Sequence, residues 1–239
     1  MTTATDLALL VEDIRRVDER LLTAVEGLTD DAVRAPSRLP GWSRGHVLAH
    51  LAGVGAGVAR QLERAVARQE RVDFYDGGRA GRDAAIEAGA GAAAAEHRAT
   101  LRATVERVER ALEKVGPEVL DRPTGYRDRP VVAVVELWWR EVEIHAADLD
   151  VGIESSGWTA GLRAHLRDYL ADRVPTGTRL DLAPTDADER ASIGDGEPVT
   201  VRGAANDLTA WLAGRAPAGP VTAERGGVVV PLPELSPWP

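Results

Sequence analysis

Glu141 and His145 are the residues in this sequence whose types and spacing most clearly suggest chemistry. They lie in the stretch Trp138–Asp150, which is predicted to be helical. At 100° per residue, two residues four apart lie one turn apart on the same side of a helix. Four apolar residues fall within about 60° of Glu141 by the same rotation, namely Val134, Leu137, Trp138 and Ile144. Burying an unpaired charge is costly, so this pair needs a partner, and a divalent cation accepts an oxygen and a nitrogen ligand.

The opposite side of the same helix is expected to be solvated. It carries Glu136, Arg140, Glu143, Ala147 and Asp150. The alternative to a metal site is an ordinary Glu–His pair on the helix surface, worth only about 0.2–0.5 kcal/mol. A third ligand elsewhere in the chain would favour the metal.

His46 and His50 repeat the four-residue spacing in a second predicted helix. Ser43 is a good N-cap for this helix, which is expected to run to about residue 70. Gly53 and Gly57 fall near the two histidines on the helical wheel. Glycine inside a helix costs stability, roughly 1 kcal/mol each, so these glycines indicate a close approach, either of another helix or of a ligand.

Composition excludes several classes of function. The chain has 239 residues and a net charge of −9, which argues against binding to nucleic acid or to an anionic membrane. No signal peptide is recognisable and no run of 18 apolar residues occurs, so a cytoplasmic protein is expected. The absence of cysteine removes any internal thiol nucleophile, so a thiol would have to arrive as a cosubstrate. Lys114 as the single lysine, among abundant arginine, is typical of a GC-rich genome such as an actinobacterial one.

The first part of the chain is predicted to be helical. Spacings of three and four between apolar residues predict helices over 6–27, 43–70 and 80–115, and a fourth that starts at Pro130. Four long helices indicate a bundle, a fold that builds metal sites from inward-facing side chains.

After Asp150 the pattern changes to that of a small α/β domain. A fifth helix is predicted over 158–174 and another over 204–212. Short strands are predicted over 178–182, 189–193, 198–201 and 226–232, with Asp195-Gly196 as a hairpin turn between the second and the third. The predicted domains are residues 1–153 and 154–239.

Two segments, Gly41–Leu51 and Arg140–His145, resemble the paired signatures of the mycothiol-dependent maleylpyruvate isomerases, within the DinB-like metalloenzymes. Two later segments, Trp211–Arg215 and Pro233–Trp238, resemble the C-terminal domain of that family. The resemblance implies an α+β fold, with a DinB-like four-helix bundle followed by a small C-terminal α/β domain.

The resemblance also implies a set of metal ligands. The family motifs place them at His50, Glu141 and His145, for a divalent metal that is most often zinc. Three protein ligands and an open position are the arrangement expected of a catalytic zinc. We consider His46 a packed or solvated histidine rather than a ligand. Asp148 lies within about 20° of Glu141 on the wheel; it either orients a ligand or is a plain carboxylate near the helix end, and we favour the second interpretation.

The implied reaction is the isomerisation of maleylpyruvate to fumarylpyruvate with mycothiol as thiol cosubstrate. A metal-bound thiol is deprotonated. The thiolate adds to the cis double bond, the resulting single bond rotates, and the thiolate then leaves. The substrate is a small dianion, so an arginine is expected to bind it. The family resemblance favours Arg215, with Arg225 as the second candidate.

Two alternatives remain open at this point. A mycothiol S-transferase or thiol-exchange enzyme on the same scaffold would keep the three ligands and act on another electrophile. A non-enzymatic metal-binding protein would hold the metal in a closed site with four ligands. The sequence does not indicate the oligomeric state.

Overall fold

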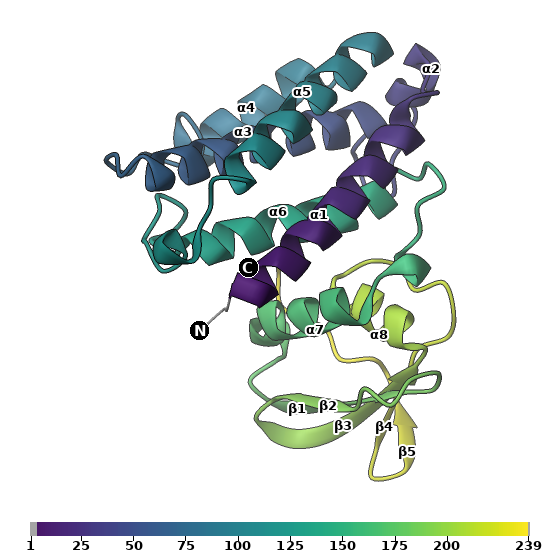
Figure 1. Cartoon of the computed structure of the whole chain (residues 1–239). Helices are drawn as coiled ribbons and strands as arrows, with labels where there is room; N and C mark the ends of the chain where they lie inside the picture. Colours follow the sequence, from purple (N-terminus) through teal and green to yellow (C-terminus); the bar gives the residue numbers. More distant parts are fainter. Residues whose placement is uncertain (1–3, 239) are drawn as a thin grey trace. The chain divides into compact units, whose positions relative to one another are not determined.

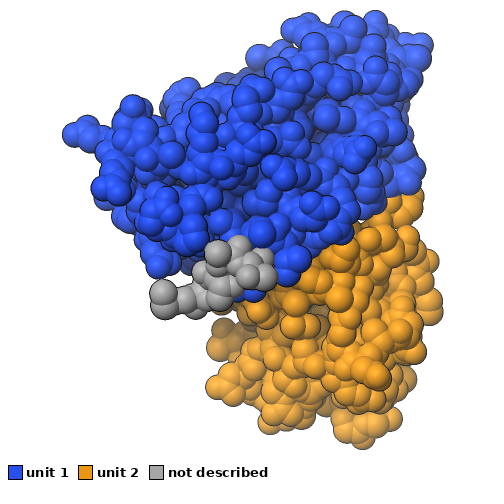
Figure 2. All heavy atoms as spheres, viewed as in Figure 1, with its two compact units in different colours: residues 1–153 blue, residues 154–239 orange. Residues whose placement is uncertain are grey.

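The computed structural model describes residues 4–238 of the chain (Figure 1). It divides into two compact units, residues 1–153 and 154–239, which are coloured separately in Figure 2. The first unit is helical, and the second combines helices with a five-stranded sheet. The predicted α+β class, helical first and strand-containing later, is confirmed. No helix among the described residues is long and apolar enough to cross a membrane.

The first unit is a bundle built on four long helices. Its elements are α1 Ala4–Val25, α2 Asp30–Arg34, α3 Arg44–Val66, α4 Gly78–Gly89, α5 Ala94–Leu112, the 3-10 turn η1 Pro117–Val119 and α6 Val131–Asp148. Helix α3 packs against α5, α6 and α4, and α1 packs against α6 and α5. Residues at helical spacing supply the core, with Ile14, Leu21, Leu51, Leu62 and Leu101 all buried. The bundle predicted from apolar periodicity is therefore present.

The single helix predicted over 80–115 is wrong, because α4 and α5 are separated at residues 90–93. The corner lies close to α3: a Cβ atom on Gly45 would come within 2.1 Å of the Ala90 carbonyl oxygen. Helix α5 has no capping side chain of its own, and the Asp30 carboxylate of α2 instead accepts a hydrogen bond from the Ala94 backbone amide at 2.7 Å. A cap from a distant residue of this kind cannot be recognised from local sequence signals.

The solvated face predicted for α6 is also wrong. Arg140, Glu143 and Ala147 are buried, although Asp150 is exposed. Helix α6 packs against both α1 and α3, so only a small part of its surface remains open. Burial raises the pKa of Glu143 to about 7, and the charge of Arg20 on α1 partly opposes that rise.

Two arginines fix the end of α6 to the start of α3. The Arg44 guanidinium donates to the Leu149 carbonyl oxygen at 2.6 Å and to the Asp150 carboxylate at 3.1 Å. Arg38 donates two hydrogen bonds to the same carboxylate. Cations at a helix C-terminus satisfy its last carbonyl groups and complement its dipole. These contacts hold together the two helices that carry the candidate metal ligands.

The second unit combines a sheet with short helices. Its helical elements are η2 Ser155–Gly157, α7 Ala160–Tyr169, η3 Ala171–Arg173 and α8 Ala205–Leu212. Its strands are β1 Gly177–Pro184, β2 Ala191–Gly194, β3 Gly196–Gly203, β4 Thr222–Arg225 and β5 Val228–Val230. The strand order is β2-β1-β3-β4-β5, and β1 and β3 are parallel while the other neighbours are antiparallel.

The predicted hairpin at Asp195-Gly196 is wrong. Strand β2 pairs with one edge of β1 and β3 pairs with the other, so the chain crosses β1 between them. Gly194 and Gly196 have φ values of 82° and 140°, and a Cβ on Gly196 would lie 2.2 Å from the backbone of Gly177. Only glycine tolerates that conformation and that approach. Strand β4 was not predicted.

Candidate metal centre

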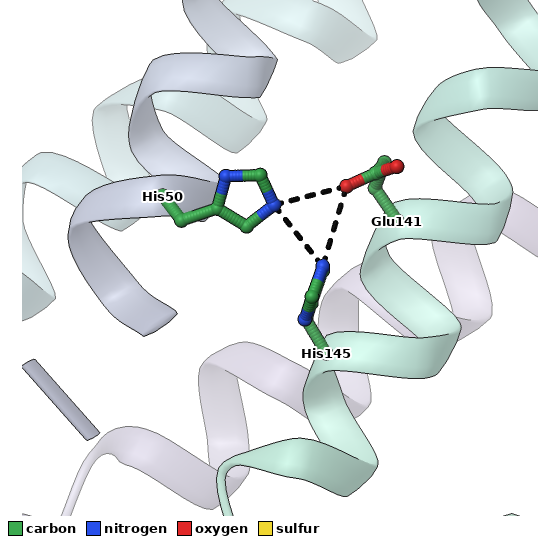
Figure 3. A group of neighbouring side chains, drawn as sticks. All are labelled: His50, Glu141 and His145. Atoms are coloured by element: carbon green, nitrogen blue, oxygen red, sulfur yellow. Dashed lines mark hydrogen bonds and ion pairs between the residues drawn. The ribbon is translucent and has the colours of Figure 1, made fainter. Parts of the chain in front are cut away.

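The side chains of His50, Glu141 and His145 converge inside the bundle. His50 comes from α3, and Glu141 and His145 come from consecutive turns of α6, as Figure 3 shows. His50 Nε2 lies 3.0 Å from both Glu141 Oε2 and His145 Nε2, and His145 Nε2 lies 3.4 Å from Glu141 Oε2. Each residue offers one ligand atom, and the three atoms all lie within 4.8 Å of one another.

The donor atoms fit a tetrahedral zinc ion. With metal–ligand distances of about 2.0–2.1 Å, tetrahedral ligand atoms lie about 3.3 Å from one another. The three observed separations, 3.0, 3.0 and 3.4 Å, agree with that value. Two imidazoles and one carboxylate are also a ligand set that zinc accepts in catalytic sites. Among the described residues this cluster supplies three donors, and a tetrahedral ion takes four ligands.

The pKa values within the trio shift in different directions. Burial alone would raise the pKa of Glu141, but hydrogen bonds from His145 and His50 outweigh burial and place it well below the usual range. Burial and the charge of His145 lower the pKa of His50 to about 4. Burial opposes the charged form of His145 as well, yet contacts with Asp148 and Glu141 raise its pKa. Metal ligands must be deprotonated, so the lowered pKa values of Glu141 and His50 favour ligation and the raised pKa of His145 opposes it.

Asp148 supports His145 from behind. Its carboxylate Oδ2 lies 2.8 Å from His145 Nδ1, and its side chain is only 1% exposed. A carboxylate behind a ligating imidazole fixes the tautomer that presents Nε2 to a metal. This contact favours the other interpretation of Asp148, in which its carboxylate orients a ligand.

Asp148→Ala is expected to weaken zinc binding roughly 10- to 100-fold, the usual effect of removing an outer partner of a ligating histidine. Competition with a chromophoric zinc chelator would measure the change. Glu136→Gln is the matched control, because Glu136 is a half-buried carboxylate of the same helix. Equal zinc affinity in wild type and Asp148→Ala would show that the 2.8 Å contact does not support His145.

Two side chains beside His50, and a third beside Arg82, were not predicted from the sequence. The Arg82 Nη2 atom lies 3.3 Å from His50 Nδ1, and the Trp42 ring packs edge-on with its centroid 5.7 Å from that of His50. Arg82 Cζ lies 6.0 Å from the centroid of the Tyr75 ring. Burial and the charge of Glu141 raise the pKa of Tyr75 to about 12, so its hydroxyl is neutral at physiological pH. No periodicity marks these residues, because they come from a loop and from α4.

The glycines of α3 have different environments. A Cβ on Gly57 would lie 2.5 Å from the Phe74 ring, so this glycine admits a close neighbour. A Cβ on Gly53 would meet no atom within 4 Å, and Gly53 is exposed. Close packing therefore explains Gly57, whereas the helix surface one turn after His50 is open at Gly53.

His46 has a local structural role. Its Nδ1 accepts a hydrogen bond from the Ser43 backbone amide at 3.2 Å and lies 2.7 Å from the Ser43 hydroxyl, which forms a capping box at the start of α3. Its Nε2 lies 3.6 Å from the Glu87 carboxylate. His46 is not one of the three residues whose donor atoms converge, and its exclusion as a ligand stays a prediction.

The two candidate arginines lie in the second unit. Arg215 follows α8; its Nη1 donates to the Ala213 carbonyl oxygen at 2.9 Å, and its Cζ lies 5.2 Å from the centroid of the Trp238 ring. Arg225 ends β4 and is exposed in the β4–β5 hairpin. Arg215 is thus held by its surroundings to a degree that Arg225 is not, and a substrate-binding role for either arginine stays a prediction.

The fold and the trio define a helical-bundle protein with a candidate metal centre, followed by a small α/β unit. Residues 14–150 match the family described as the mycothiol maleylpyruvate isomerase N-terminal domain. That match spans more than half of the chain, so the chain belongs to this family.

Solved structures share the whole fold. A crystal structure of the mycothiol-dependent maleylpyruvate isomerase superposes with a TM-score of 0.84 at 21% sequence identity, and the match covers 100% of both chains. A crystal structure of a histidine-to-alanine mutant of the mycothiol-dependent maleylpyruvate isomerase gives a TM-score of 0.83 at 20% identity, again over 100% of both chains. No curated protein sequence matches the chain significantly.

Proposed function

We propose that this chain is an enzyme that isomerises maleylpyruvate to fumarylpyruvate with mycothiol as thiol cosubstrate. The observation that carries the proposal is the trio of His50, Glu141 and His145. All three residues lie within residues 14–150, the segment that matches the isomerase family. The shared fold over the full length supports the same conclusion.

The residues of the chain have separate roles in this proposal. His50, Glu141 and His145 hold a divalent cation, most favourably zinc, and Asp148 fixes the orientation of His145. When bound, the metal lowers the pKa of a thiol and so supplies a thiolate nucleophile at neutral pH. Glu141 stays ionised and His50 stays neutral at that pH, so both remain ligands. Arg215 binds the anionic substrate, and Arg225 is the second candidate for that role.

The chain itself contains no thiol, because it has no cysteine. The nucleophile must therefore be brought by the cosubstrate, and the protein provides its position and its deprotonation. Addition of a thiolate to the cis double bond leaves a single bond that rotates, and elimination returns the thiol and gives the trans product. Atoms balance without any oxidant or further reactant.

The test is an ultraviolet assay of maleylpyruvate with the zinc-loaded protein, with and without mycothiol. The expected result is conversion to fumarylpyruvate only when the thiol is present. Metal analysis of the same sample ensures that one zinc is bound per chain. No conversion in that sample would reject the isomerase proposal and favour a thiol transferase acting on another electrophile.

A further inference from the structure

Arg82 places a cation directly beside the trio in the first unit. It lies near the start of α4, and its side chain is 26% exposed. Its Nη2 approaches His50 Nδ1 at 3.3 Å from the side opposite the converging donor atoms, since His50 uses Nε2 toward Glu141 and His145. Its Cζ lies 6.0 Å from the centroid of the Tyr75 ring. The guanidinium is thus both near the centre and reachable from solvent.

The Arg82 contact differs in chemistry from the one that supports the other histidine. His145 Nδ1 faces the Asp148 carboxylate, which is an acceptor. His50 Nδ1 faces a guanidinium, which has donors only. An imidazole that ligates a metal through Nε2 carries its proton on Nδ1 and is itself a donor there. Arg82 therefore cannot hydrogen-bond to His50 once Nε2 is a ligand, and its Nη2 group is released for another acceptor while Nη1 donates to Asp83.

The charges around the centre show which acceptor would enter. A divalent cation at the trio would be balanced by the Glu141 carboxylate and by the Asp148 carboxylate behind His145. Arg82 adds a further positive charge, since its Nη2 lies 3.3 Å from His50 Nδ1. Its ion pair with Asp83 joins sequence neighbours, and the Asp83 side chain is 53% exposed, so water screens that pair. The loaded centre therefore attracts an anion through Arg82.

We propose that Arg82 binds one carboxylate of the substrate beside the metal centre. A guanidinium offers two parallel N–H groups that match a carboxylate, which gives orientation as well as affinity. The Tyr75 ring lies beside Arg82, and the Trp42 ring lies beside His50. Arg82 would thus select anionic electrophiles over neutral ones. The identity of the substrate rests on the proposed function, but the carboxylate site does not.

Titration calorimetry with maleate, a cis-dicarboxylate that carries no thiol, tests this site in the zinc-loaded full chain. Arg82→Leu is expected to weaken maleate binding at least about 10-fold, because a charge-assisted bidentate contact is lost. Arg82→Lys should restore part of the affinity, since lysine keeps the positive charge but lacks the two parallel N–H groups of the guanidinium. Arg79→Leu is the matched control: Arg79 is an exposed arginine one turn earlier on α4, and its removal should change affinity less than twofold.

Two results would overturn the proposal. One is unchanged maleate affinity in a zinc-loaded Arg82→Leu variant. The other is loss of zinc from that variant, which would make Arg82 a support for the metal ligands. Because no turnover is measured, the outcome does not depend on whether the chain isomerises maleylpyruvate. If the isomerase activity is present, Arg82→Leu should raise the KM for maleylpyruvate and leave the KM for mycothiol unchanged.

Discussion

A His50→Ala variant is expected to lose both zinc and isomerase activity. The variant removes one of three converging donor atoms and the only one that α3 supplies to the trio. The remaining pair, Glu141 and His145, comes from one helix and cannot enclose the ion from two sides. The loss of zinc affinity should exceed the roughly 10- to 100-fold typical of an outer partner of a ligand. Chelator competition and the ultraviolet assay would measure the two effects.

His46→Ala is the matched control for this experiment. His46 lies one turn earlier on α3 and is the same residue type, but it caps the helix with Ser43. Removal of a helix cap costs about 1 kcal/mol of stability, so this variant should melt slightly earlier and still hold one zinc per chain. Wild-type zinc affinity in His50→Ala, or loss of zinc in His46→Ala, would contradict the assignment of the ligands.

The signals for the candidate ligands are local within each of the two helices that carry them. Glu141 and His145 are one turn apart, and His50 belongs to a motif of eleven consecutive residues, 41–51. Apolar periodicity by itself predicted only that these side chains face away from solvent. The family resemblance supplied the link between two helices separated by about ninety residues, and no principle of spacing within one helix gives that link.

The role of Arg82 was not predictable from local patterns. It lies in an alanine- and glycine-rich stretch that periodicity treats as the start of one long helix over 80–115. At the break over residues 90–93, the Asp30 carboxylate caps α5 from a distance. A prediction that misses this break cannot place α4 relative to α3. It therefore also misses the contact between Arg82 and His50. The wrong prediction of one helix over 80–115 and the missed role of Arg82 therefore have the same cause, the unrecognised break between α4 and α5.

The interior of the bundle also contains a buried polar contact, between Asp18 and Trp138, that the apolar periodicity of α1 did not predict. Asp18 lies on α1 four residues after Ile14 and three before Leu21, on the face that packs into the core. It is 0% exposed, and its Oδ2 accepts a hydrogen bond from Trp138 Nε1 at 3.2 Å. Its other oxygen, Oδ1, has no hydrogen-bond partner among the described residues. A buried carboxylate with a single donor is unfavourable when charged.

Asp18→Asn is therefore expected to stabilise the chain at neutral and alkaline pH. Burial raises the pKa of Asp18 from 3.8 to about 8, and the hydrogen bond from Trp138 only partly offsets it. Between those two values the folded chain keeps the proton and the unfolded chain has lost it. The stability of the wild type thus falls as pH rises through this window, by about 1.4 kcal/mol per pH unit and roughly 4 kcal/mol in total by pH 7.

Asparagine keeps the acceptor for Trp138 and has no proton to lose, so it removes this dependence. Urea unfolding of both proteins at pH 4, 5, 6, 7 and 8, with tryptophan fluorescence as the probe, would measure the difference. The two proteins should have similar stability near pH 4, and the advantage of the variant should grow with pH and level off above about pH 8. Other titrating groups cancel in the comparison, because both proteins carry them. A constant difference across the series would mean that Asp18 is ionised in the folded chain and that its burial is balanced by contacts other than Trp138.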